Sequence, residues 1–80
     1  MTIDDESDVQ ATAFWIVVPD RIRNGDYYPG DMRVFETVRN AVRFVMEKLP
    51  AHQRGTAEIE TAHGGFYRID EIVSAYRQLR

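Results

Sequence analysis

Hydrophobic and polar positions form distinct patterns along this chain, separated by turn-forming residues. Residues 12–18 are a continuous run of β-branched and aromatic side chains that ends at Pro19, which predicts a strand. Because the run does not alternate with polar residues, both of its faces should be at least partly covered, as in a central strand. One of two sets of side chains then points to the less covered face of the sheet: Ala13, Trp15 and Val17, or Phe14, Ile16 and Val18.

Two other segments have the spacing of amphipathic helices. In residues 37–49 the apolar side chains fall three and four positions apart, at Val38, Ala41, Val42, Val45 and Leu49. Thr37 can act as the N-cap of this helix, and Pro50 prevents it from continuing. A second helix is predicted to follow Asp70 as its N-cap, with an apolar stripe at Ile72, Val73, Tyr76 and Leu79.

Between these helices the pattern changes to that of a β-hairpin. Residues 56–61 alternate, and Ala62-His63-Gly64-Gly65 suits a turn before a returning strand at 66–69. In the alternating segment, Ala57, Ile59 and Thr61 share one side, and Glu58 and Glu60 share the other. Residues 51–55 are predicted to form a polar loop. Residues 32–35 form either a short strand, which we favour slightly, or part of a long ordered loop.

This order of elements predicts an α+β fold. We expect a small three- or four-stranded, mainly antiparallel sheet with two helices packed on one face, in the order β-(β)-α-β-β-α. Residues 11–80 form this single domain, because 80 residues leave room for one hydrophobic core. Residues 1–10 are predicted to be a disordered acidic tail. Two helices cannot cover both faces of the sheet, so one face is left open or meets a partner.

Composition and charge narrow the classes of function. The hydrophobic fraction of 44% and the charged fraction of 29% are typical of a globular protein. A net charge of −3 argues against binding to a nucleic-acid backbone as the main activity. The longest apolar run, residues 13–18, is too short to span a bilayer, and the acidic N-terminus lacks the basic region of a signal peptide. We therefore expect a soluble, cytoplasmic protein that does not bind membranes.

Candidate chemistry is sparse in this sequence. The chain has no cysteine, and its two histidines, His52 and His63, lie in predicted loops without the spacing of metal ligands. No nucleophile stands beside a base, so we predict no catalytic residue, no metal, no cofactor and no enzymatic activity. The glycines after His63 suit a hairpin turn better than a phosphate loop, which should lead into a helix.

One weak family resemblance is present in the first half of the chain. Val17-Val18-Pro19-Asp20, followed by Glu36-Thr37-Val38-Arg39-Asn40-Ala41-Val42, resembles the front of HicB-type antitoxins, in which a strand ending in proline precedes a helix with a similar opening. Arg21-Ile22-Arg23 stands where that family has a glycine-rich turn. Nothing from Thr56 onward suggests its usual DNA-binding appendage. The resemblance implies an antitoxin-like regulatory protein and assigns no site residue.

Large aromatic side chains are numerous for so small a core. We take four as candidate partner-binding residues, Trp15, Tyr27, Tyr28 and Phe66, because aromatic residues bring a large contact area to interfaces. We therefore expect a small non-enzymatic protein-interaction module that binds another protein, or a second copy of itself, through an open sheet face. The alternatives are a small-molecule or nucleotide-binding domain and the antitoxin-like regulatory protein.

Overall fold

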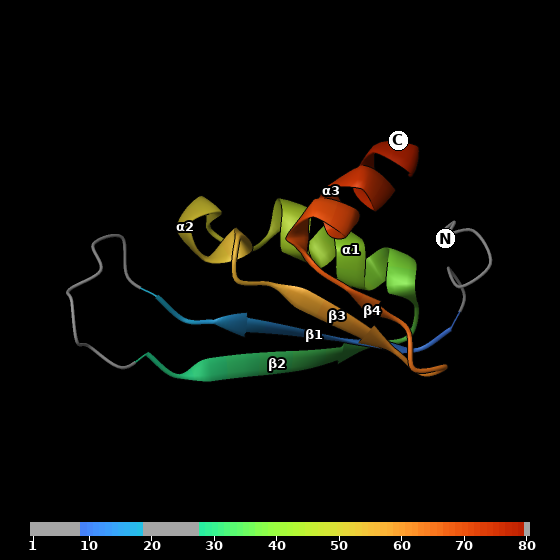
Figure 1. Ribbon diagram of the computed structural model, residues 1–80, viewed down its shortest axis with the longest axis horizontal. Helices are drawn as coiled ribbons and strands as arrows, with labels where there is room; N and C mark the ends of the chain where they lie inside the picture. Colours follow the sequence, from blue (N-terminus) through green and yellow to red (C-terminus); the bar gives the residue numbers. More distant parts are fainter. Residues whose placement is uncertain (1–8, 19–27, 80) are drawn as a thin grey trace.

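Four strands form one antiparallel sheet in the computed structural model, which describes residues 9–18 and 28–79. The strands are β1 (Ala11–Ile16), β2 (Gly30–Phe35), β3 (Glu58–Thr61) and β4 (Phe66–Tyr67). Their order across the sheet is β2-β1-β3-β4, so β2 and β4 are the edge strands (Figure 1). The prediction of an antiparallel sheet with a central first strand is confirmed, and residues 32–35 belong to a strand.

Helices cover one face of this sheet. They are α1 (Val38–Glu47), the single turn α2 (Ala51–Arg54) and α3 (Ile69–Gln78). Helix α1 contacts β1, β2 and β3, while α3 contacts β3, β4 and α1, and both lie on the same side of the strands (Figure 1). The predicted α+β architecture with two helices on one face is therefore confirmed.

Helix α1 forms where its apolar spacing predicts. The Thr37 hydroxyl accepts a hydrogen bond from the Asn40 backbone N–H at 3.1 Å, which satisfies one of the free donors at the helix start. The apolar stripe is buried along its whole length: Val38, Ala41, Val42, Val45 and Leu49. A hydroxyl cap and one apolar stripe thus account for both the start and the orientation of this helix.

Helix α3 begins two residues earlier than predicted. Asp70 is not its N-cap; Arg68 holds that position and Asp70 lies in the first turn. The Arg68 backbone N–H donates to Oε1 of Glu71 at 3.4 Å, so a glutamate within the helix binds the N-cap from inside. Both carboxylates lie near the helix N-terminus, where the helix dipole stabilises negative charge.

The predicted polar loop at 51–55 is wrong, because most of it forms α2. The Pro50 carbonyl accepts hydrogen bonds from the backbone N–H groups of Gln53 at 2.9 Å and Arg54 at 3.1 Å. The turn is also held from outside, since Nε2 of Gln53 donates to the Val18 carbonyl at 3.1 Å. This contact spans 35 positions, so local sequence patterns do not show it.

The hydrophobic core lies between the sheet and the two longer helices. Its largest fully buried side chains are Ile59, Ile72, Val38, Val42 and Val45. At the surface, the Tyr76 hydroxyl of α3 donates a hydrogen bond to a carboxylate oxygen of Glu47 of α1 at 2.9 Å. The predicted acidic tail, apart from its last residues, lies outside the described part of the chain.

No helix in the described ranges is long and apolar enough to cross a membrane.

Candidate interaction surface

The sheet face opposite α1 and α3 carries large apolar side chains that no part of the described structure covers completely. Exposure is 39% for Ile16, 53% for Met32, 51% for Val34 and 46% for Phe66, and Phe14 among them is half-buried. We call these five residues the open-face patch. They come from β1, β2 and β4, while β3, which lies between β1 and β4, carries Glu58 and Glu60 on this face.

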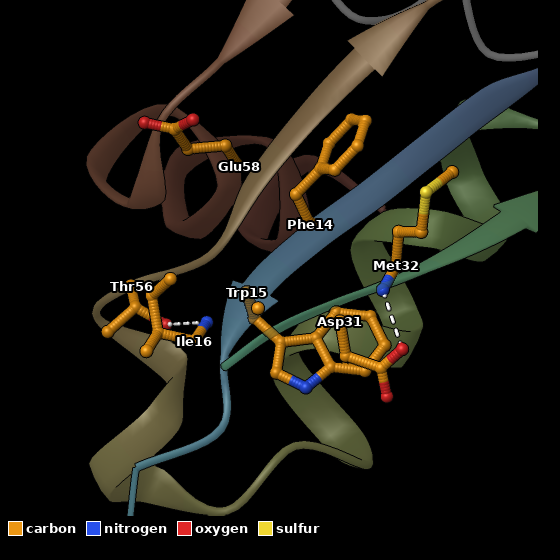
Figure 2. A pocket seen from close by; sticks show the side chains of 8 residues that line it. Phe14, Trp15, Ile16, Asp31, Met32, Thr56 and Glu58 are labelled. Carbon is orange, nitrogen blue, oxygen red and sulfur yellow. Dashed lines mark hydrogen bonds between the residues drawn. The ribbon is translucent and has the colours of Figure 1, made fainter. Parts of the chain in front are cut away.

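The strand register explains why these residues share a face. Phe14 lies directly opposite Met32 on β2 and Glu58 on β3, and residues opposite each other in a sheet point to the same side. In the same way, Glu60 lies opposite Phe66. Alternate residues of β1 point to the helices and are buried, while Phe14 and Ile16 point away from them. Figure 2 shows Phe14 and Met32 on the side of their strands opposite the Trp15 indole.

A groove of about 490 Å³ lies at one end of the patch. Its lining includes Phe14, Ile16, Met32, Thr56 and Glu58 (Figure 2). The groove exists partly because Gly30, the cross-strand partner of Ile16, has no side chain. A Cβ at Gly30 would meet only the Trp15 carbonyl oxygen at 3.6 Å and Cδ1 of Ile16 at 3.8 Å, which are ordinary contacts. The backbone therefore does not require glycine at this position.

The ionised side chains on this face of the strands are acidic. Glu58 is half-buried beside Phe14, and Glu60 is exposed beside Phe66. Within the described part of the chain, neither carboxylate has a hydrogen-bond or ion-pair partner. Arg33 of β2 points to the other face, where its guanidinium lies over the rings of Phe35 and Phe44, 5.2 and 5.4 Å from their centroids. The open face thus combines apolar side chains with negative charge that has no partner among the described residues.

At the free edge of the sheet, one backbone N–H group of β2 already has a hydrogen-bond partner within the strand. The Met32 backbone N–H donates to Oδ1 of the neighbouring Asp31 at 2.8 Å (Figure 2). An edge strand normally presents such N–H groups to any added strand. Because a carboxylate already occupies this one, the face of the sheet is a better candidate surface than its edge.

Of the sequence-predicted partner-binding residues, Phe66 lies on the open-face patch. Trp15 is in the core, only 8% exposed, with its ring centroid 5.2 Å from that of Phe44. It borders the groove, but its side chain lies on the helix-covered face of β1 and is not part of the open-face patch. Tyr28 is half-buried and already makes an interaction, and Tyr27 lies outside the described residues.

Met32 and Val34 were missing from the sequence-predicted set. Their alternation with Arg33 ordinarily indicates that the apolar residues face the core and the arginine faces solvent. The structure reverses this orientation, because the Arg33 side chain packs against Phe35 and Phe44 on the helix side. The only available signal was the doubly apolar β1, which indicated that part of this strand must point to an uncovered face.

The remaining candidate chemistry lies apart from the patch. His52 is exposed on α2 and His63 is exposed in the hairpin turn; the described residues contain no group of three potential metal ligands. In the turn, the Gly64 N–H donates to the Thr61 carbonyl at 3.0 Å and the Gly65 N–H to the Thr61 hydroxyl at 2.8 Å. These amides are therefore already bonded within the hairpin, which weakens the case for a phosphate-binding loop there.

Comparisons with protein-family models, curated proteins and solved structures found no match to this chain. The resemblance to HicB-type antitoxins gains no support from them. Inference about function therefore depends on the surface itself.

Proposed function

We propose that this chain is a small non-enzymatic protein-interaction module that binds a partner protein through its open-face patch. One observation carries the proposal: Ile16, Met32 and Val34 lie together on one sheet face, each 39% exposed or more. Single exposed apolar residues are normal on protein surfaces, but a contiguous group of them marks an interaction site. Phe66 extends the same surface to the opposite edge.

The architecture supplies the physical reason for binding. A sheet is stable when its apolar face is packed against another layer. Here α1 and α3 form that layer on one side, and a partner would form it on the other. Burying a half-exposed Met, Val or Phe side chain contributes roughly 1 kcal/mol, so a few such residues supply much of a moderate affinity. A cytoplasmic location belongs to this proposal, since a chain without cysteine needs no oxidising compartment to fold.

The groove supports a second candidate, the binding of a small apolar molecule. Its volume of about 490 Å³ lies within the size range of ligand sites. Chemical-shift screening of a compound library tests this candidate, with Gly30→Val as the variant that fills the groove. Compounds that shift Phe14 and Met32 amides in the wild type but not in the variant would support it. A screen without such compounds would exclude it.

The proposed function is tested by comparing partner capture by two charge variants. The double variant Met32→Lys/Val34→Lys adds two cations to the patch, and Ser74→Lys/Gln78→Lys adds the same charge at exposed positions of α3. Both proteins, once shown to be folded by circular dichroism, are used with the wild type to capture proteins from a lysate of the source cells. We expect a protein that binds the wild type and the α3 variant but not the patch variant. If no captured protein distinguishes the two variants, the proposal is wrong.

A further inference from the structure

The charges beside the open-face patch narrow the class of partner, and this inference rests on the proposed function. We propose that the patch binds an amphipathic helix of another protein, in which an apolar stripe is flanked by Lys or Arg. The apolar stripe covers β1 and β2, and the cations lie over β3. Such a partner is favoured by two carboxylates, by the absence of cations on the described strands beside them, and by the width of the face.

Glu58 and Glu60 must be covered together with the patch. Glu58 is the direct cross-strand neighbour of Phe14, and Glu60 that of Phe66. Cross-strand neighbours on one face have Cβ atoms about 5 Å apart, so a partner that covers the rings also removes water from the carboxylates. A carboxylate that loses water without gaining a cation or a hydrogen bond opposes binding. A partner that binds well therefore brings positive charge to β3.

A second copy packed face to face would not bring that charge from its described strands. The strand residues on the open face include Glu58 and Glu60 but no Lys or Arg, and Arg33 points to the helix side. Arg68 follows β4 as the N-cap of α3 and, within the described chain, pairs with neither glutamate. Packing two open faces together would place the carboxylates of both copies in one apolar interface. The charge pattern therefore favours a different, basic partner over self-association.

The dimensions of the face favour a helix as the shape of the partner. Neighbouring strands lie about 4.8 Å apart, so β2, β1 and β3 together present a surface about 10 Å wide, close to the diameter of an α-helix. The groove beside Ile16 and Met32 offers a recess for an apolar side chain from such a helix. Addition of a strand at the edge is less suitable, because Asp31 already accepts the Met32 N–H.

The test uses two synthetic peptides of 18 residues that are stapled into helices and share one leucine stripe. One carries Lys beside the stripe and the other carries Glu at the same positions. We expect the basic peptide to shift the amide signals of Phe14, Met32 and Glu58 and to bind at least ten-fold more tightly than the acidic peptide. Each of Glu58→Gln and Glu60→Gln should weaken it by about two- to five-fold. The control Asp70→Asn, on α3, should leave the affinity unchanged.

Outcomes against this inference are distinguishable from failure of the proposed function. If both peptides bind equally at the open face, the inference of a basic helix is wrong and the interaction module stands. The same holds if neither peptide binds although a captured partner depends on the patch. A wild-type dimer in sedimentation equilibrium that Met32→Lys dissociates would overturn it in favour of a second copy. Lack of peptide binding together with no patch-dependent partner would overturn both.

Discussion

Replacement of Trp15 by alanine should strongly destabilise the fold instead of only removing a binding contact. The indole is 8% exposed and lies on the helix-covered face of β1. Its ring packs against Phe44 of α1, with centroids 5.2 Å apart and planes tilted by 53°. The side chain therefore joins the central strand to the helix that covers it, and its removal leaves a cavity between them.

The expected loss of stability follows from this burial. A tryptophan buries about 150–250 Å² on folding, which at about 25 cal/mol per Å² corresponds to roughly 4–6 kcal/mol. Measured Trp-to-Ala replacements in protein cores cost about 3–5 kcal/mol. A chain of 80 residues is typically stable by only about 4–12 kcal/mol in total. We expect Trp15→Ala to lower the free energy of unfolding by about 3 kcal/mol or more and to leave a marginally stable protein.

Urea denaturation followed by far-ultraviolet circular dichroism measures this loss, because the signal does not depend on the tryptophan. Phe66→Ala is the matched control: it also removes a large ring from the sheet, but from a side chain that is 46% exposed. The control should cost about 1 kcal/mol or less. A Trp15→Ala protein within 1 kcal/mol of the wild type, or a control that costs as much as Trp15→Ala, would refute the assignment of the two faces of β1.

Three further predictions concern the backbone and the helix cap, and each is checked by urea denaturation. Gly30→Val should leave stability unchanged or raise it by up to about 1 kcal/mol, because its Cβ meets only ordinary contacts and valine favours strands; a marked loss would contradict this account of the groove. Gly64→Ala should cost about 1–2 kcal/mol, because φ is +84° at this residue. Gly55→Ala should stabilise the protein by about 0.4–1 kcal/mol, because φ is −64° there and an added Cβ would have no atom within 4 Å. If both substitutions changed stability in the same direction, the backbone argument would be refuted. Thr37→Ala should cost about 1 kcal/mol by removing the cap of α1, and Thr37→Ser should retain most of that stability.

Much of the fold was predictable because its signals are local. The apolar run before Pro19 indicated β1, and the three-and-four spacing after Thr37 indicated α1. The single turn α2 was missed because it depends on a hydrogen bond from Gln53 to Val18, far away in the sequence. The start of α3 was displaced by two residues because Glu71, inside the helix, accepts a hydrogen bond from the backbone of the N-cap Arg68.

The candidate surface was predictable only as far as the existence of an open face. Two helices are too few to cover both sides of the sheet, and this follows from counting elements. The residues on that face did not follow, because both alternations of β1 are apolar and the pattern alone favours neither. For β2 the pattern pointed the wrong way, since an arginine faces the helices and Met32 and Val34 face outward.

The sequence by itself determined where the strands and long helices form, because periodicity, capping residues and prolines act on the chain within a few positions. Only the tertiary structure decided which side of each strand became the surface. Small Ala11 and Ala13 are buried beneath the helices, and Trp15 fills the space beside Phe44. Once that packing is made, the strict two-residue period of a strand sends Phe14 and Ile16 to the opposite face. Packing of the core thus determined the surface that the chain offers to a partner.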